Sequence, residues 1–342
     1  MLGNKDIFFQ VFRIAFIAMA LAVGFDLLFQ HVLIPAQQPF ANVRKLERII
    51  SDDHPEDIPI FGSSIARRAY YCDSIGPGFY NYGMAGSLFG SIYPLLKIQL
   101  EKDNDYPIIL DFDQHTFLHS EYVQLDLSNY VPHVSNPHIQ EMLQFHGKED
   151  WQHEVPGFRY FGLYTDYLRD LLKPSLEREE LISRGGVFYP EKKKAFQRFL
   201  AKRERMIEDK RELDERVKEG EHLLTEDEKK WHFYLDAILN FHPDSLMVSR
   251  YEALMYDNPY KTFVLIYSPQ SEVKLRGLEN YGDIQEFLSG LKDRHPNLRV
   301  LDYSKAGYGN EYYRDSGHLN IAGAKKFSAL ISDDLERILG RR

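Results

Sequence analysis

Five short apolar runs constrain the fold of this chain more than any other feature of its sequence. Each is bounded by turn-forming residues and has the length of a β-strand; they are Ile58–Phe61, Phe79–Tyr82, Pro107–Phe112, Thr262–Tyr267 and Leu298–Leu301. Runs of this kind are typical of strands that are buried on both faces of a sheet. Because helical patterns separate them, we expect an α/β fold, a three-layer sandwich around a mostly parallel, five-stranded sheet.

Helical periodicity is clearest at the C-terminal end of the chain. Apolar residues recur there at spacings of three and four, at Ile321, Ala324, Phe327, Ile331, Leu335 and Ile338. Asn320 precedes them in the position of an N-cap, so a long terminal helix is predicted. Shorter helical patterns cover Ser91–Glu101 and Asp283–Leu291.

A long interruption, from about residue 120 to 260, separates the third apolar run from the fourth. It contains an aromatic-rich part, Trp151 to Leu172, and a strongly charged part, Glu191 to Lys230. Before Gly220, apolar residues in the charged part recur every seven positions, at Phe199, Met206 and Leu213. This spacing predicts a first helix that ends near Gly220.

A second helix is indicated by Thr225 and Glu228, which have the spacing of a capping box. Its apolar positions are Trp231, Leu235 and Ile238. We therefore expect a helical hairpin inserted into the α/β domain. Its charge runs are interpreted as a solvated helix face, with binding to a partner as the alternative.

The N-terminal segment, residues 1–36, has a different composition from the rest of the chain. From Ile7 to Pro35 apolar residues dominate, and the only charged side chains are Arg13 and Asp26. As a helix, Ile14–Ile34 would span about 30 Å, the thickness of the hydrocarbon core of a bilayer. Arg13 would reach the head groups, whereas Asp26 would need a partner or water. We expect an uncleaved membrane anchor that contacts lipid through residues 7–34.

A cleaved signal peptide is the alternative for this segment, because Ala20-Leu21-Ala22 has the small residues of a cleavage site. Basic residues nearly balance across the span, so they do not fix its orientation. A short N-terminus before a large domain favours export of the domain. The expected location is therefore the cell membrane, with a single-pass anchor and the domain outside the cytoplasm, in the periplasm. The rest of the chain would form a linker at 37–57 and an α/β domain at 58–342, interrupted at about 120–260.

The charge and the cysteine content exclude some classes of function. The formal net charge is -9 and no basic face is concentrated in the sequence, which argues against nucleic acid as a partner. The single cysteine, Cys72, permits no internal disulfide and is interpreted as buried packing.

Three segments next to predicted strand ends or helix starts carry residues suited to catalysis. The first strand ends in Gly62-Ser63-Ser64, which puts hydroxyls at a strand-to-helix turn. The second is followed by a small-residue loop from Asn81 to Gly86, where a backbone N–H can approach an oxyanion. Near the other end of the chain, Asp315 precedes His318 by three residues, so the carboxylate can orient the imidazole and leave its other nitrogen free as a base. Each segment alone is compatible with an ordinary turn.

Taken together, the three segments resemble the SGNH (GDSL-like) hydrolase superfamily. Gly62-Ser63-Ser64 is similar to the Gly-Asp-Ser motif of that family, which implies that Ser64 is the nucleophile. Asn81 to Gly86 resembles the Asn-x-x-x-x-Gly block, which makes Gly86 the oxyanion-hole glycine. The resemblance covers residues 57–120 and 260–342, and it implies an SGNH/flavodoxin-like fold.

The remaining blocks of the family are matched less evenly. Asp315 and His318 match the Asp-x-x-His block before the terminal helix, which implies their roles as orienting acid and base. Ser63 replaces the usual Asp. Gln114 stands where the family has an oxyanion Asn, so the implied oxyanion hole comprises Ser64, Gly86 and Gln114. These departures make the chain more similar to a membrane-tethered branch that includes the D-alanyl transfer protein of teichoic acid modification, and, more loosely, to alginate O-acetylation proteins.

Other polar residues near the strand ends receive less specific interpretations. His115 and His119 are four residues apart, but no third ligand is evident, so neither a metal nor a cofactor is expected. Asp111 and Asp113 are interpreted as solvated or local hydrogen-bond acceptors. Ser268-Pro269-Gln270 is a turn with a possible role in substrate binding.

The sequence therefore predicts a serine-dependent O-acyl esterase or O-acyltransferase that works through an acyl-enzyme. Its expected substrate is an acylated cell-envelope polysaccharide or glycan, or an acyl donor. The alternative is an inactive or weakly active SGNH-like scaffold for a multi-span membrane O-acyltransferase, suggested by Asp26 in the span and by the charged hairpin.

Overall fold

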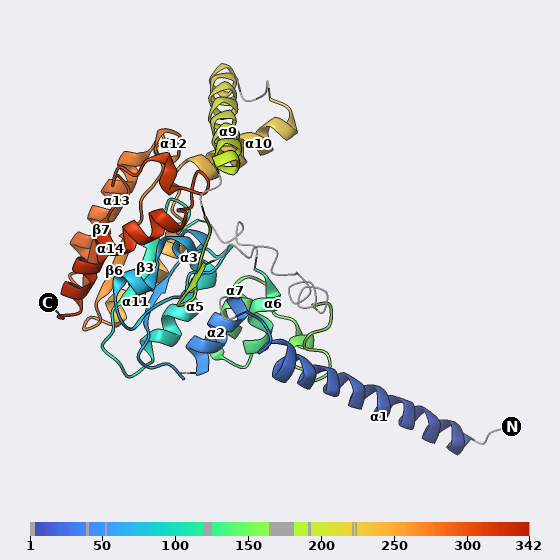
Figure 1. Cartoon of the computed structure of the whole chain (residues 1–342). Helices are drawn as coiled ribbons and strands as arrows, with labels where there is room; N and C mark the ends of the chain where they lie inside the picture. Colours follow the sequence, from blue (N-terminus) through green and yellow to red (C-terminus); the bar gives the residue numbers. More distant parts are fainter. Residues whose placement is uncertain are drawn as a thin grey trace. The chain divides into compact units, whose positions relative to one another are not determined.

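The computed structural model describes residues 4–38, 41–51, 53–118, 125–163, 181–190, 193–220, 222 and 224–341 (Figure 1). The chain divides into two compact units. One comprises Met1–His54 and Leu125–Arg178, and the other comprises Pro55–Gln124 and Glu179–Arg342. Each unit is described by itself.

The second unit is built on a five-stranded sheet in which every pairing is parallel. The strand order is β2-β1-β3-β6-β7. The strands are β1 (Ile58–Phe61), β2 (Phe79–Asn81), β3 (Ile108–Phe112), β6 (Phe263–Tyr267) and β7 (Leu298–Asp302). All five apolar runs are thus confirmed as strands, and their carboxyl ends meet at one edge of the sheet, where catalytic loops gather in parallel sheets.

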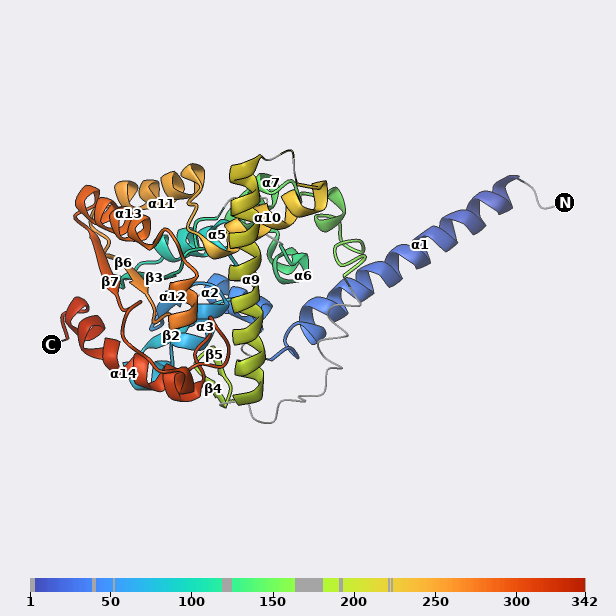
Figure 2. The same ribbon diagram turned by 90° about the horizontal axis from the view of Figure 1, so that it is seen from above.

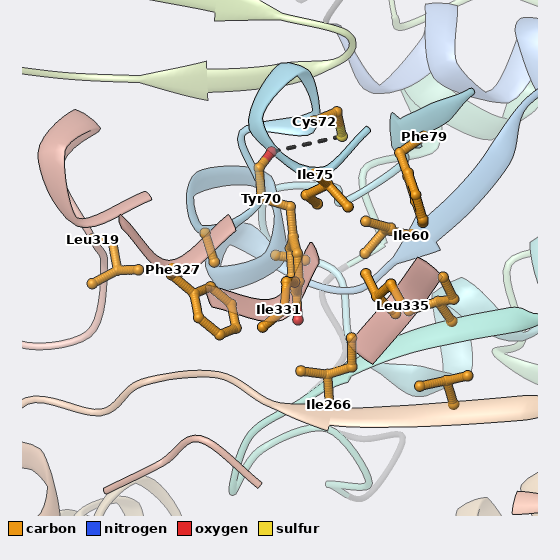
Figure 3. Close-up of a cluster of buried hydrophobic side chains, with 14 of the residues drawn as sticks. Ile60, Tyr70, Cys72, Ile75, Phe79, Ile266, Leu319, Phe327, Ile331 and Leu335 are labelled. Carbon is orange, nitrogen blue, oxygen red and sulfur yellow. Dashed lines mark hydrogen bonds between the residues drawn. The ribbon is translucent and has the colours of Figure 1, made fainter. Parts of the chain in front are cut away.

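Helices provide apolar side chains to both faces of this sheet. One cluster joins the sheet to α3 (Ser64–Ala69), α4 (Cys72–Ile75) and α14 (Ile321–Ile338) (Figure 3). Cys72 is buried in it, as predicted. The other face carries an aromatic cluster around Phe112, whose ring lies 6.2 Å from those of Phe117 and Phe287. Its helices are α5 (Phe89–Leu100), α11 (Ser245–Asp257) and α13 (Tyr281–Arg294).

Helix α14 begins where the sequence predicted. The Asn320 side chain accepts a hydrogen bond from the Gly323 N–H at 3.0 Å, which confirms its role as the N-cap. Six apolar residues of the predicted stripe lie on this helix, and four of them, Phe327, Ile331, Leu335 and Ile338, pack in the cluster of Figure 3 or against it. Ala324 is also fully buried.

The charged part of the interruption folds as two helices, α9 (Lys193–Glu219) and α10 (Glu226–Leu239) (Figure 2). Both hydrogen bonds of the capping box between Thr225 and Glu228 are present. Leu213 and Leu235 are buried between the helices, with Met206 packed against them, whereas Phe199 is 45% exposed. The stripe that holds the hairpin together therefore begins at Met206 rather than at Phe199.

A short antiparallel hairpin, β4 (Leu181–Ser183) and β5 (Gly186–Phe188), was not predicted. Its turn places Arg184 and Gly185 at positive φ. The Arg184 carbonyl accepts a hydrogen bond from the Asn81 N–H at 2.8 Å, so the hairpin lies beside the edge strand β2. Strands of three residues carry too little pattern to be recognised in sequence.

The first unit contains the apolar helix α1 (Asn4–Leu28), which continues through a π-helical turn (Phe29–Leu33). Residues 8–33 form the helix, among the described residues, that is long and apolar enough to cross a membrane. Asp26 is buried and accepts a hydrogen bond from the Gly157 N–H at 2.6 Å, which gives this acid the partner it was expected to need. A side chain at Gly157 would meet the Cβ of Ala22 at 2.9 Å, so glycine allows this close approach.

The rest of the first unit consists of short helices. They are α2 (Asn42–Ser51), α6 (Leu127–Tyr130) and α7 (Pro137–Phe145), with 3₁₀ turns at Val131–His133 and Trp151–His153. Helix α2 lies within the segment expected to be a linker, residues 37–57. Its apolar residues Val43, Leu46 and Ile49 are buried, so this part of the segment is a packed helix.

Candidate active site

Ser64 lies at the first residue of α3, directly after the turn that follows β1. Gly62 in this turn has φ +152°, and a Cβ there would lie 2.6 Å from that of Ala66 and 2.9 Å from that of Asp111. The Ser63 hydroxyl accepts a hydrogen bond from the Ile65 N–H at 3.2 Å and so caps the helix. Of the two adjacent serines, Ser63 thus has a structural role, while the Ser64 hydroxyl turns to a different partner.

That partner is His318, which lies 254 residues further along the chain. Ser64 Oγ and His318 Nε2 are 2.9 Å apart. The other ring nitrogen, Nδ1, lies 2.8 Å from Asp315 Oδ1 and 3.0 Å from Oδ2. Because a carboxylate accepts, Nδ1 carries the hydrogen and Nε2 is free to accept the serine proton. The structure therefore brings all three predicted catalytic residues into one hydrogen-bonded chain.

The loop that carries Asp315 and His318 is held in place by its own backbone and by a neighbouring helix. Asp315 Oδ1 also accepts from the N–H groups of Gly317 at 3.0 Å and His318 at 2.9 Å. The Ser271 hydroxyl, at the N-cap of α12 (Glu272–Arg276), donates to the Ser316 carbonyl at 2.5 Å. These contacts fix the carboxylate before any substrate arrives.

The protonation states follow from this geometry. Burial acts to raise the pKa of Asp315, but the hydrogen bonds from His318 and Gly317, together with the Arg68 guanidinium 3.7 Å away, lower it to about 2. Burial lowers the pKa of His318 below its ordinary 6.5, and Asp315 offsets this only in part. At neutral pH the site therefore holds a charged carboxylate and a neutral imidazole, the states required of an orienting acid and a general base.

The loop after β2 is fastened to the start of α3. The Asn81 side chain is fully buried; its amide donates to the carbonyls of Ala66 at 2.9 Å and Tyr70 at 3.0 Å, and its oxygen accepts from the Gly83 N–H at 2.9 Å. A Cβ at Gly83 would lie 2.4 Å from the Arg67 nitrogen, so the two backbones touch here. Asn81 thus positions the segment that carries Ser64.

Gly86 lies at the open end of this loop. It has φ +76°, and a Cβ built there would meet no heavy atom within 4 Å. Its N–H makes no hydrogen bond within the described part of the chain. An unengaged backbone donor beside open space is compatible with the predicted oxyanion role, which stays a prediction.

Gln114 has a different partner from the one predicted. Its side chain is 1% exposed, and its Nε2 donates to the Ile238 carbonyl in the last turn of α10 at 2.9 Å. The His115 ring nitrogen Nε2 lies at the same distance from this carbonyl. The last carbonyls of a helix lack partners within the helix, and these two side chains satisfy one of them. Gln114 is thus committed to holding the inserted hairpin, and only its second amide hydrogen is left for an oxyanion.

Asp111, on β3, and Asp113, directly after it, are buried rather than solvated. Asp111 accepts a hydrogen bond from the Tyr70 hydroxyl at 2.6 Å, and burial raises its pKa to about 8. Asp113 accepts from the His115 N–H at 2.8 Å and lies 3.8 Å from the ammonium of Lys274, which is also buried. Both aspartates therefore serve as local hydrogen-bond acceptors, which was one of the two interpretations of the sequence. The other interpretation, that they are solvated, is wrong.

The described residues contain no group of three or more side chains that could hold a metal ion. His115 is engaged with Ile238, and His119 lies outside the described residues. In the Ser268-Pro269-Gln270 turn, the Gln270 amide donates to the Ser268 carbonyl at 2.7 Å, and both residues are buried.

Several residues at this edge were missed by sequence reasoning. Arg68 and Arg314 both lie against the ring of Tyr189, with their guanidinium carbons 5.2 Å and 3.4 Å from its centre. Tyr189 follows β5, and its carbonyl accepts a hydrogen bond from the Ile321 N–H at 2.9 Å. The inserted segment therefore reaches the end of the loop that carries Asp315 and His318. The signal available in the sequence was the Arg67-Arg68 pair, which begins three residues after Ser64.

Comparison of the chain with models of known protein families and with curated proteins finds no match in either.

Proposed function

We propose that this protein is a serine-dependent O-acyl esterase or O-acyltransferase that acts on acyl groups of a cell-envelope glycan through an acyl-enzyme. The observation that carries the proposal is the hydrogen-bonded chain from Ser64 through His318 to Asp315, with a heavy-atom distance of 2.9 Å between nucleophile and base. A hydroxyl, a neutral imidazole and a buried carboxylate in this order are the parts that acyl transfer requires.

The reaction begins when His318 Nε2 accepts the Ser64 proton as Oγ attacks the ester carbonyl. The resulting imidazolium is stabilised by Asp315, which stays charged. The oxyanion is assigned to the backbone N–H groups of Ser64 and Gly86, with a contribution from Gln114 only through its second amide hydrogen. His318 then returns the proton to the leaving alkoxide. Water or a sugar hydroxyl, deprotonated by His318, attacks the acyl-enzyme and restores Ser64.

We further propose that the parallel-sheet unit is a three-layer domain of the SGNH (GDSL-like) type. The support is the order of the motifs along the chain together with their meeting at the carboxyl edge of the sheet. Helix α1 serves in this proposal as a single-pass anchor, with the catalytic unit outside the cytoplasm. A multi-span membrane O-acyltransferase is a candidate partner.

The adjacent serines offer a matched pair of variants to test the function. With 4-nitrophenyl acetate as substrate and the full chain in detergent micelles, Ser64→Ala is expected to lower kcat by at least about 10³-fold, because it removes the nucleophile. Ser63→Ala removes only a helix cap and should keep activity within about tenfold. Full activity of Ser64→Ala would end the proposal.

The scaffold alternative draws support from the engagement of Gln114 by Ile238, since it leaves the oxyanion site with fewer free donors than the family resemblance implies. A fluorophosphonate probe separates the two functions, because it reacts only with an activated serine. Labelling of the folded wild-type protein supports the enzyme, and its absence supports the scaffold.

A further inference from the structure

Arg203 of helix α9 is a buried guanidinium without a partner. Its side chain is 8% exposed, and its Nε and Nη2 atoms are buried and make no hydrogen bond. No carboxylate within the described residues pairs with it, and burial lowers its pKa to about 10. A buried charge is normally paired, because an unpaired one loses its hydration with nothing in exchange.

Helices α9 and α12 lie side by side (Figure 2), and Arg203 is close enough to Lys274 and His115 to lower the pKa of each. At the end of α12, Arg276 pairs with Glu204 of α9 at 3.0 Å, and just beyond it a Cβ on Gly277 would lie 2.6 Å from the Ile207 side chain. Lys210 then meets Glu279 at 3.2 Å. These contacts advance in the same direction along α9 and along residues 276–279, and Arg203, just before Glu204, lies near enough to Lys274 to act on its pKa.

The Lys274 turn of α12 is directly connected to the catalytic loop. Ser271, one turn before Lys274, holds the Ser316 carbonyl between Asp315 and His318. The Lys274 ammonium lies 3.8 Å from Asp113, at the end of β3. A ligand group that reaches Arg203 would therefore lie one helical turn away from the loop that carries the general base.

The charges around this edge do not balance. Asp315 faces His318 and Arg68, and Asp113 faces Lys274 and His115. Two acids on α9 form ion pairs with other cations, Glu204 with Arg276 and Asp214 with Lys210. A second guanidinium, that of Arg314, has its Nη1 buried without a hydrogen bond. Among the described residues, Arg203 and Arg314 thus have no counter-charge, although the net charge of the chain is -9.

We propose that Arg203 binds an anionic group, a carboxylate or a phosphate, on the substrate, with Arg314 as a second cation at the same edge. The guanidinium offers a planar fork of N–H donors, which matches both anions. The inference rests on the proposed function and narrows it: the acylated glycan or acyl donor is acidic. The inserted hairpin then has a role, because it carries Arg203 to a site that the α/β unit alone would lack.

The test compares an anionic probe with a neutral one in the full chain. O-acetylated trigalacturonate supplies carboxylates, O-acetylated galactose 6-phosphate supplies a phosphate, and O-acetylated galactotriose is neutral. In Arg203→Met, the ratio of kcat/KM for the anionic to the neutral probe is expected to fall about 10- to 100-fold, mainly through KM, because a charged hydrogen bond is lost. Arg203→Lys should restore part of the ratio. Which anionic probe shows the larger fall identifies the anion.

Arg205, an exposed residue on the same helix, provides the matched control: Arg205→Met should leave the ratio unchanged. Thermal unfolding without ligand should show no lower Tm for Arg203→Met, because the substitution removes an uncompensated buried charge. Equal losses with anionic and neutral probes would overturn the inference and assign Arg203 a purely structural role.

A binding measurement separates this inference from the proposed function. Calorimetric titration of Ser64→Ala with trigalacturonate and with inorganic phosphate should detect binding to at least one, and the added Arg203→Met substitution should abolish it. Binding without any turnover in the wild type would refute the catalytic proposal but support the anion site. Turnover without anion binding, and with no preference for either charged probe, would refute the anion site alone.

Discussion

Replacing Asp315 by Asn should remove a pH-dependent part of the stability of the α/β unit. The pKa of Asp315 falls from its ordinary 3.8 to about 2 in the folded protein. Its side chain is only 12% exposed, so solvent screens its contacts little. A difference of this size corresponds to about 2 kcal/mol of stabilisation of the charged form.

The direction of the pH effect follows from the depressed pKa. The stabilisation is fully present above about pH 5, where the carboxyl group is charged in both the folded and the unfolded chain. It is lost as the pH falls from about 4 to 2, because the unfolded chain binds the proton first. Asn does not titrate. The free-energy difference between the wild type and Asp315→Asn should therefore be about 2 kcal/mol smaller at pH 2 than at pH 7.

Urea unfolding of the full chain in detergent micelles measures this difference. In a Trp151→Phe background, Trp231 on α10 is the remaining tryptophan, so its fluorescence reports on the α/β unit. Asp283→Asn, which changes an exposed acid on α13, is the matched control. A difference between wild type and Asp315→Asn that stays flat from pH 7 to 2 would refute the inferred contacts of the carboxylate.

Three further predictions concern His318, the loop after β2 and the side chain of Gln114. The kcat/KM of the wild type should fall with decreasing pH at a midpoint below 6.5, because burial lowers the pKa of His318. Arg68→Gln removes a nearby cation and should move this midpoint to higher pH; an unchanged midpoint would contradict the inference. Gly83→Ala should cost about 2–3 kcal/mol in urea unfolding, because its Cβ would lie 2.4 Å from the Arg67 nitrogen, whereas Gly86→Ala adds no steric contact and should cost less. Gln114→Ala should lower the free energy of unfolding by about 1 kcal/mol and kcat by less than tenfold, since the side chain binds the Ile238 carbonyl. A loss of about 10²–10³ in kcat would instead identify Gln114 as a main donor to the oxyanion.

The extent to which the sequence predicts this structure depends on how local each signal is. Strands such as β3 are unbroken apolar runs, and the cap at Asn320 depends on neighbouring residues alone, so both were predictable. The hairpin β4–β5 is joined to β2 by the hydrogen bond from the Asn81 N–H to the Arg184 carbonyl, a contact that no local pattern encodes. Helix α2 was missed because its polar face resembles a linker, while its apolar face, with Leu46, is buried.

The candidate site shows the same division. Ser64, Asp315 and His318 were identified because each belongs to a short motif beside a strand end or before a helix, and the parallel sheet brings such ends together. The hydrogen bond from Gln114 to the Ile238 carbonyl could not be predicted, because this carbonyl lies 124 residues away on an inserted helix. Arg203 had no signal at all: within a run of charged residues, only the packing of α9 on α12 distinguishes it from its solvated neighbours.

The central claim, that Ser64 is activated by His318, is tested most directly by locating a covalent adduct. After treatment with a fluorophosphonate, tandem mass spectrometry of the peptide containing Ser63 and Ser64 should place the phosphonyl group on Ser64. His318→Ala should abolish the adduct while the protein keeps its far-UV circular dichroism. An adduct on Ser63, or one on Ser64 that forms equally fast without His318, would contradict the account.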